Sequence, residues 1–352
     1  MGAKKKNWLK TIISILLVIV LVLGGIAGYL AYKYVYMPNV TIANKKSTLI
    51  YIPTGSTFED VINILNENEL LKDPESFRWL AKEKKYTTAV KPGKYRVLAK
   101  MSNSALINLL RLGKQEPIEI NFTGLHTVKE LMSRVGRRIE ADSNALIRAV
   151  NDDTYVGKYG FTSENVQALF IPDVYEFYWN TSVDDFFQRM AVAYKAFWTD
   201  SRKQQAKALG LSQTQVYILA SIVQGEQCCD KDEKKVIAGL YLNRLRKGMR
   251  LQSDPTVIYA RGNFNIQRVS LEQIKYTDSP YNTYLHEGLP PGPIGFAQES
   301  SIDAVLNYST NDYLYMCAKD DLTGKHCFSK TLEQHEVYRK KYRKALDERN
   351  IH

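Results

Sequence analysis

Residues 211–255, LSQTQVYILASIVQGEQCCDKDEKKVIAGLYLNRLRKGMRLQSDP, contain the pattern of two helices followed by a polar loop. Ser212 with Gln215 three residues later is a capping box, which predicts a helix start. Residues then recur at steps of three and four and so share one helix face, namely Val216, Leu219, Val223 and Glu226. The pattern predicts a helix with an apolar stripe that ends in a carboxylate.

That carboxylate, Glu226, is the candidate catalytic residue. A carboxyl at the end of an apolar stripe is partly removed from water, which raises its pKa and keeps a proton on it near neutral pH. General acids are tuned in this way. The alternative is a helix-end glutamate that faces solvent or pairs with Lys231. This stretch alone does not choose between the two interpretations.

Composition limits the classes of protein that the chain can belong to. The 352 residues are 45% hydrophobic and 24% charged, which is the range of globular proteins, and they suffice for two cores. The formal net charge of +11 is spread along the chain without dense arginine clusters or aromatic RNA-binding motifs, which argues against nucleic acid as a partner. The sequence contains no Gly-rich phosphate-binding loop, so no nucleotide is expected as a ligand. An anionic polymer or a membrane surface fits the charge better.

The N-terminus has the pattern of a membrane anchor. Four lysines lie within residues 1–10, and residues 11–32 form an uncharged run rich in Ile, Leu and Val. Such a run is long enough to cross a bilayer as a helix. Ala27-Gly28-Tyr29 is a poor cleavage site, which favours an uncleaved signal anchor over a cleaved signal peptide. The lysines predict a cytoplasmic basic segment at 1–10, a transmembrane helix at 11–32 and an extracytoplasmic (periplasmic) remainder.

The fold class predicted for the remainder is α+β, in two parts. Residues 47–119 alternate strand, helix, helix, strand and helix, which is the size of a LysM-like carbohydrate-binding subdomain. A plain spacer domain is the alternative. Residues 120–350 then form a larger mixed α+β domain. In it, the aromatic segment 169–178 is interpreted as core rather than as a sugar-binding groove. Residues 288–294 are too rich in Pro and Gly for a helix or strand and predict a rigid loop.

The four cysteines predict at most one long-range disulfide. Cys228 and Cys229 are adjacent in sequence, whereas Cys317 and Cys327 flank a predicted late hairpin that would bring them opposite one another. Outside the cytoplasm Cys317–Cys327 is therefore the plausible pair. The spaced Cys and His sets of a metal site are missing, and His326 beside Cys327 is weak evidence for one, so no metal and no cofactor are expected.

The chain resembles the endolytic murein transglycosylases of the YceG-like (MltG) type. The resemblance rests on five motifs in order, which are 219–226, 243–245, 248–259, 281–284 with 288–294, and a late Phe328-Ser329 followed by His335. A single-pass anchor and a LysM-like subdomain belong to the same pattern. In the family the catalytic Glu is the second of a Glu-x-Glu pair, which falls on Glu226, while the first position is Gln224 here.

The resemblance implies an enzyme that cleaves the MurNAc–GlcNAc bonds of nascent peptidoglycan strands without water and leaves 1,6-anhydroMurNAc ends. Glu226 would act as acid and then as base. The implied setting is the plasma (inner) membrane, with peptidoglycan synthases as protein partners. Five residues are candidates for holding the sugar or orienting Glu226, with turn and cap duties as the alternative, namely Asn243, Gln252, Asp254, Tyr281 and Asn282.

Two other functions stay open from the sequence. A peptidoglycan-binding scaffold without activity is suggested by Gln224 in place of a glutamate. A hydrolase (muramidase) would use Asp254 as the second carboxylate beside Glu226. Lytic activity separates the first alternative from an enzyme, and the chemistry of the product separates the second.

Overall fold

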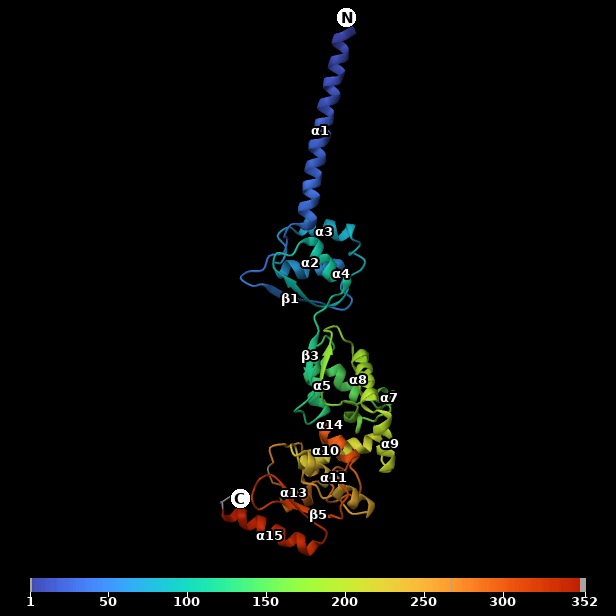
Figure 1. Cartoon of the computed structure of the whole chain (residues 1–352), viewed down its shortest axis with the longest axis vertical. Helices are drawn as coiled ribbons and strands as arrows, with labels where there is room; N and C mark the ends of the chain where they lie inside the picture. The colour runs from blue at the N-terminus through green and yellow to red at the C-terminus, as the bar shows by residue number, and fades with distance from the viewer. Residues whose placement is uncertain (1, 267, 349–352) are drawn as a thin grey trace. The chain divides into compact units, whose positions relative to one another are not determined.

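The computed structural model describes residues 2–266 and 268–348, with side chains from Trp8 onward, so the side chains of Lys4, Lys5 and Lys6 and residues 349–350 lie outside the described part. The chain is mixed α+β, as predicted. It divides into two compact units, the first formed by residues up to Ile118 with 177–180, and the second by 119–176 and 181–352. Figure 1 shows the order of the elements along the chain.

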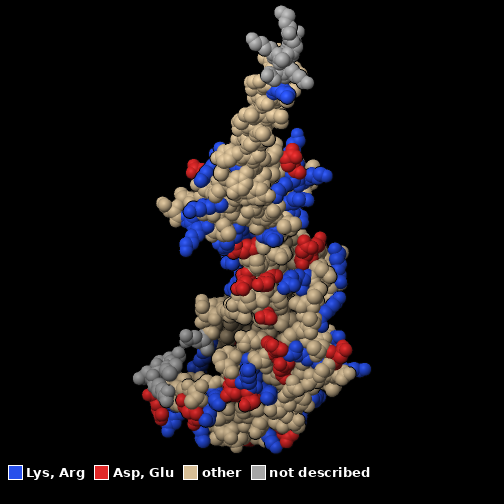
Figure 2. Space-filling model, turned by 45° about the horizontal axis from the view of Figure 1, so that its top comes forward, with Lys and Arg blue, Asp and Glu red and all other residues tan. Residues whose placement is uncertain are grey.

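Helix α1 (Gly2–Tyr36) begins the chain. Its part from Trp8 to Tyr36 is long and apolar enough to cross a membrane, with a mean hydropathy of 2.7, although a signal sequence would pass the same test. In Figure 2 its surface is almost free of charged side chains, whereas acidic and basic side chains alternate over the rest of the visible face. The helix extends four residues beyond the predicted span, and its last turn packs on the first unit through Val35.

The first unit has one layer of helices on a two-stranded antiparallel sheet. Its elements are β1 (Ser47–Ile52), α2 (Phe58–Glu67), α3 (Pro74–Glu83), β2 (Gly93–Leu98) and α4 (Asn103–Leu112). Ile50 lies opposite Tyr95 in the register, and both side chains are buried. Local signals mark two of these helices, because Thr57 forms a capping box before α2 and Gly113 ends α4 in the left-handed region with φ +68°.

The second unit begins with a short sheet covered by helices. Its first elements are β3 (Ile118–Asn121), α5 (Val128–Gly136), α6 (Ser143–Val150), α7 (Asp153–Gly157), η1 (Val166–Leu169), β4 (Val174–Phe177), α8 (Val183–Phe197) and α9 (Asp200–Ala208). The strands β3 and β4 pair. The aromatic segment is core at its start, since Phe170 is fully buried against Phe186 and Phe187, while Val174 and Tyr178 are exposed.

The centre of the second unit is α10 (Gln213–Glu226), which packs against α11 (Lys231–Arg246) and α14 (Glu299–Leu306). Ser212 and Gln215 form the predicted capping box. The predicted single apolar stripe is too narrow, because every residue from Val216 to Val223 is buried. A helix that is buried all round is a central core helix. Glu226 therefore projects from the end of the core rather than from the edge of one face.

Helix α12 (Asp254–Arg261) packs against α10, and the other remaining elements complete the second unit. They are α13 (Leu271–Tyr276), β5 (Tyr315–Ala318), β6 (His326–Ser329) and α15 (Leu332–Glu348). The polar loop predicted after the second helix is shorter than expected, because Asp254 and Pro255 already form the first turn of α12. Proline is favoured at this position, where its missing N–H has no helical partner to lose.

The late hairpin forms as predicted, but its disulfide does not. β5 and β6 are antiparallel, and Cys317 lies directly opposite Cys327 in the register. Both thiols are nevertheless free, and the disulfide joins the adjacent residues Cys228 and Cys229 instead. Burial raises the pKa of Cys317 to about 11, so the thiol form is favoured there at neutral pH.

Candidate functional site

Glu226 is the last residue of α10 and is half-buried among hydroxyl groups. The Tyr241 hydroxyl, from α11, donates to Glu226 Oε1 at 2.7 Å, and the Ser253 hydroxyl, from the N-terminal cap of α12, donates to the same oxygen. Oε2 receives no hydrogen bond from the described side chains. The carboxyl thus has one oxygen held by the protein and one available to a ligand, and its partner is not Lys231.

The surroundings of Glu226 favour its protonated form. Burial raises the pKa of Glu226, and the charge of Asp254 acts in the same direction. The hydrogen bonds from Ser253 and Tyr241 and the charge of His326 oppose this effect without reversing it. The position at a helix C-terminus adds to the cost of a negative charge, because the last carbonyl groups point toward it. These are the conditions that a general acid requires.

Ser253 is placed by threonine hydroxyls on two segments far apart in the sequence. Its backbone N–H donates to Thr283 Oγ1 at 3.0 Å, and its carbonyl accepts from Thr256 Oγ1 at 2.6 Å. The two threonine hydroxyls lie 2.9 Å apart, and all three residues are at most 1% exposed. The loop at 282–284 therefore fixes the start of α12 beside Glu226.

Asp254 lies next to Ser253, but its carboxyl has a partner of its own. The Tyr284 hydroxyl donates to Asp254 Oδ1 at 2.5 Å. Burial raises the pKa of Asp254 while this hydrogen bond lowers it, and the net shift is upward. The protonated form of Asp254 is therefore favoured, and a carboxyl group that carries a proton is neither a nucleophile nor a base for water.

Asn243 and Gln252 are both connected to the segment around Arg244. Asn243 Nδ2 donates to the carbonyl oxygens of Asn311 at 2.8 Å and Tyr313 at 3.2 Å. Gln252 is exposed, has φ +52° and accepts from Arg244 Nη1 at 3.2 Å. Arg244 itself is only 6% exposed and also donates to backbone carbonyls, so burial lowers its pKa. The Asn243 amide is thus used by backbone carbonyls, whereas the Gln252 side chain reaches the surface.

Tyr281 and Asn282 differ in their access to solvent. Asn282 is fully buried, and its side-chain amide donates to the carbonyls of Ile274 and Thr277, both at 2.9 Å. It closes the loop that carries Thr283. The half-buried Tyr281 ring packs on Tyr259 with ring centres 4.9 Å apart. Of these two candidates, Tyr281 is the one with an accessible surface.

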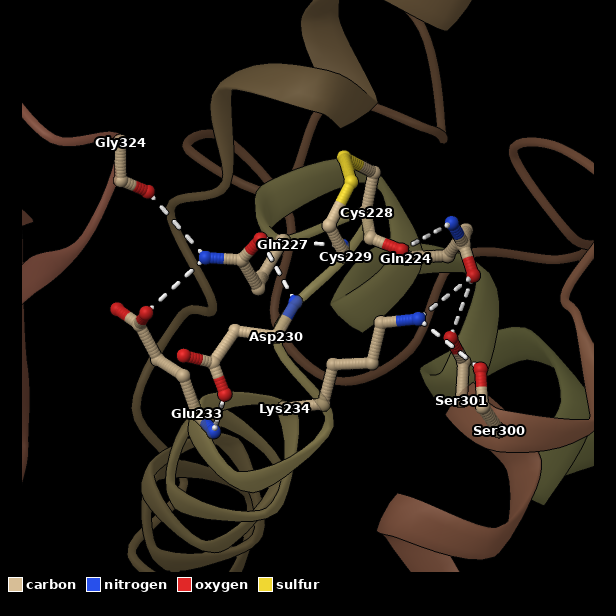
Figure 3. The surroundings of a disulfide bond; sticks show 10 residues. All are labelled: Gln224, Gln227, Cys228, Cys229, Asp230, Glu233, Lys234, Ser300, Ser301 and Gly324. Carbon is tan, nitrogen blue, oxygen red and sulfur yellow. Dashed lines mark hydrogen bonds between the residues drawn. A yellow bond between two sulfur atoms is a disulfide. The ribbon is translucent and has the colours of Figure 1, made fainter.

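Gln224 lies two residues before Glu226 and contacts a buried lysine. Figure 3 shows Lys234, from α11, and two serines of α14 on the same side of the Gln224 side chain. Lys234 Nζ donates to Gln224 Oε1 at 3.2 Å and to Ser300 Oγ at 3.1 Å, while Ser301 Oγ donates to Gln224 Oε1. Lys234 is 1% exposed and forms no ion pair with a described residue, and burial lowers its pKa.

The sequence analysis did not find Tyr241, Ser253 or His326 as site residues. Ser253 had a signal, because it lies between two candidates in a polar run. Tyr241 carried no such signal in the sequence, because a tyrosine in an apolar helix is usually a core residue. His326 was considered only as a metal ligand, and among the described residues no group of three or more His, Cys, Asp and Glu is arranged to hold a metal ion.

The chain is similar to several known proteins. The profile of the YceG-like family matches residues 50–341. A protein named endolytic murein transglycosylase from Bacillus subtilis (strain 168) is 29% identical over 94% of this chain and 93% of its own length. One with the same name from Streptococcus pneumoniae serotype 2 is 28% identical over 92% of this chain, which spans 64% of that relative.

A solved structure gives the same result. The crystal structure of a YceG-like protein from Listeria monocytogenes superimposes with a TM-score of 0.53 at 25% identity, covering 84% of this chain and 99% of that one. The resemblance predicted from the five motifs is confirmed. Since the family profile covers most of its length, the chain belongs to the YceG-like family.

Proposed function

We propose that the chain is a membrane-anchored endolytic murein transglycosylase with Glu226 as its general acid and base. The observation that carries the proposal is the single half-buried carboxyl at the end of α10, whose pKa is raised by burial. The names of the relatives support the reaction class and peptidoglycan as the substrate. Cutting within nascent glycan strands would terminate their elongation.

The proposed reaction needs only one carboxyl group. The proton on Glu226 passes to the oxygen that links MurNAc C1 to GlcNAc, and the C1–O bond breaks. The C6 hydroxyl of the same MurNAc then bonds to C1 and returns its proton to Glu226. This intramolecular attack has a high effective molarity, so it does not require an enzymic base for water. The product carries a 1,6-anhydro ring, and the enzyme regains its starting protonation state.

The other candidates receive separate roles in this proposal. Asp254, Gln252 and Tyr281 contact the sugar, because their side chains are exposed or half-buried. Gln252 and Asp254 flank Ser253 at the start of α12, and Tyr281 precedes the loop 282–284 that holds Ser253. Asn243 and Asn282 are positioning residues, because their amides are used by backbone carbonyls. The hydrogen bond from Tyr284 and the raised pKa of Asp254 argue against a second catalytic carboxylate.

Product analysis tests the reaction. Purified glycan strands are digested in water enriched in ¹⁸O, and the fragments are analysed by mass spectrometry. The expected fragments end in 1,6-anhydroMurNAc, are lighter by one water than hydrolytic fragments and contain no ¹⁸O at C1. Reducing MurNAc ends that contain ¹⁸O would establish the hydrolase with Asp254 as second carboxylate. If the folded protein cleaves nothing, the remaining function is that of a peptidoglycan-binding scaffold without activity.

Glu226→Gln tests the residue assignment. The amide keeps the size of the side chain and its hydrogen bonds but has no proton to give, so kcat should fall by about 10²–10⁴-fold with an unchanged fold. Glu272→Gln, at an exposed position of α13, is the matched control and should retain the parental rate. Parental digestion by the Glu226 variant would contradict the assignment.

Two further parts of the proposal concern the N-terminal half. The apolar helix α1 supports a single-pass anchor, with the basic residues at 1–10 in the cytoplasm and the second unit outside. The strand and helix order of the first unit supports a LysM-like glycan-binding role. A pull-down of insoluble peptidoglycan with Glu226→Gln, compared with the same Glu226→Gln variant lacking the first unit, tests that role because neither protein digests the ligand.

A further inference from the structure

A buried carboxylate connects the end of α10 to the strand β6. Glu233, on α11, is 8% exposed, and its Oε2 accepts from Gln227 Nε2 at 3.0 Å. Gln227 follows Glu226 directly and caps α10. Figure 3 shows the Gln227 amide between Glu233 and the Gly324 carbonyl, which it reaches at 3.2 Å. Glu233 therefore fixes the backbone next to the catalytic carboxyl.

The other oxygen of Glu233 holds His326. Glu233 Oε1 accepts from the His326 backbone N–H at 2.6 Å and lies 2.9 Å from His326 Nδ1. Two contacts to one oxygen determine both the place of the residue and the orientation of its ring. With Nδ1 occupied by Glu233, Nε2 is the nitrogen that remains for another partner. This arrangement of carboxylate and imidazole resembles the way that catalytic histidines are oriented.

Glu233 joins His326 to Gln227, the residue directly after Glu226, so His326 lies near the C-terminal end of α10. After burial and the bonds from Ser253 and Tyr241, the charge of His326 is the next influence on the pKa of Glu226, and it lowers this pKa. Other titratable or charged groups that face Glu226 are Tyr241 and Arg244 from α11, Asp254 from α12 and Tyr284. The charged group beside His326 is Glu233, which also interacts electrostatically with Lys325.

We propose that His326, oriented by Glu233, is a positioning residue that stabilises the carboxylate which Glu226 becomes after giving up its proton. The inference rests on the proposed function, since it assigns His326 a part in the same proton transfer. Glu226 must be protonated before bond cleavage and negatively charged after it. When the His326 ring carries a proton, its positive charge lowers the free energy of the second state, where burial alone would raise it.

His326→Asn separates this role from a structural one. The asparagine Nδ2 takes nearly the place of His326 Nδ1, so the hydrogen bond to Glu233 can be kept while the rest of the ring and its charge are removed. The expected results are a pKa of Glu226 higher by about one unit and a fall in kcat of about tenfold. His286→Asn, at an exposed histidine, is the control and should change neither quantity.

The pKa of Glu226 is measured without reference to activity. The full-length protein in detergent is labelled with ¹³C at the glutamate carboxyls and titrated by NMR, and the Glu226 signal is identified by its loss in Glu226→Gln. The alkaline limb of kcat/KM against pH is recorded in parallel, because it falls as the acid loses its proton. In His326→Asn both should move to higher pH.

The outcomes distinguish the two proposals. An unchanged Glu226 titration in folded His326→Asn overturns the role of His326, whatever the activity. Anhydro products together with an unshifted titration would leave the proposed function in place without His326. Absence of cleavage by the wild type would refute the function, and the titration would still report whether His326 interacts with Glu226. Glu233→Gln provides a second variant, which should raise the pKa of Glu226 by a smaller amount because the ring is less well oriented.

Discussion

At the scale of single residues, the Glu226 carboxyl accepts two hydroxyl hydrogen bonds on one oxygen, from Tyr241 and Ser253. Both bonds are stronger to the carboxylate than to the acid, so they limit the pKa rise that burial causes. The proton of the acid form is then carried by Oε2, which is the oxygen left for the substrate. In the proposed reaction the two hydroxyls determine which oxygen of Glu226 gives up and takes back the proton.

Tyr241→Phe and Ser253→Ala should each raise the pKa of Glu226 by about one unit, because a hydrogen bond to a charged group contributes about 1.5–3 kcal/mol. The acid form of Glu226 then persists to higher pH, so the alkaline limb of the kcat/KM profile moves to higher pH while the maximal rate falls. The measurement is the pH profile of both variants and of the double variant. A limb that moves to lower pH in either variant would show that the hydroxyl does not stabilise the carboxylate.

Gln224→Glu should stabilise the protein without loss of activity, because it supplies a carboxylate to the buried ammonium of Lys234. Burial lowers the folded-state pKa of Lys234, so in the window between its folded and unfolded pKa values the unfolded chain binds more protons. The free energy of unfolding therefore rises with pH across that window. In Gln224→Glu this slope should be smaller, and the free energy of unfolding near neutral pH larger by about 1 kcal/mol.

Thermal unfolding between about pH 7 and pH 10 measures this slope for both proteins. Gln213→Glu, at the first residue of α10, adds a charge of the same sign at the other end of the helix and serves as the control. A Gln224→Glu protein with the parental slope would mean that Lys234 does not sense position 224. Loss of lytic activity would mean that the neutral amide, rather than its place in the packing, is required beside Glu226.

At the scale of elements, the helices α10 and α12 approach so closely that one residue between them must be glycine. A Cβ on Gly225 would lie 2.8 Å from Pro255 Cβ and 3.7 Å from Ile294 Cδ1. Pro255 lies in the first turn of α12, directly after Ser253 and Asp254. The distance between the Glu226 carboxyl and the residues at the start of α12 is therefore set by the contact of the Gly225 backbone with the Pro255 side chain.

Gly225→Ala should lower kcat by about 10²-fold, because a displacement of α12 by a fraction of an ångström moves Ser253 away from Glu226. The free energy of unfolding should change by less than about 1 kcal/mol, since alanine favours the helix and partly offsets the contact. Gly157→Ala is the control, because α7 has open space around that Cβ. Equal kcat values for the two alanine variants would show that α12 tolerates the shift.

The sequence predicted long elements with local signals and missed short elements that depend on distant partners. The capping residues Ser212 and Thr57 announce their helices because the signal lies within four residues. Helix α12 begins at Asp254-Pro255, which also reads as a turn, and only the threonine contacts from 256 and 283 distinguish the two. Glu226 was found because its own helix carries the signal. Tyr241 contacts it from another helix, fifteen positions along the chain, and nothing local indicates that contact.

At the scale of the whole molecule, the apolar helix α1 and the first unit share an interface. Asn103, which is 1% exposed, donates to the Tyr34 carbonyl at 2.9 Å and to Ser76 Oγ at 3.0 Å. Val35 packs against the core of this unit. The last turn of α1 is therefore part of a folded domain as well as the end of the proposed anchor, which couples the first unit directly to the membrane segment.

Two truncations separate these roles of α1. Removal of residues 1–32 should yield a soluble protein with the parental stability and activity, because the contacts of Tyr34 and Val35 remain. Removal of residues 1–36 should also yield a soluble protein, but it takes away the Tyr34 carbonyl, one of the two acceptors of the buried Asn103 amide, at a cost of about 1–3 kcal/mol. For a unit of this size the unfolding temperature should fall by about 4–8 °C per kcal/mol.

Differential scanning calorimetry of both fragments, with Asn103→Ala in each, measures the effect. Asn103→Ala should destabilise the longer fragment more than the shorter one, since only the longer one retains the bond. Equal unfolding temperatures for the two truncations would mean that the folded domain begins after Tyr36. A 33–352 fragment that stays with membranes would refute α1 as the sole anchor.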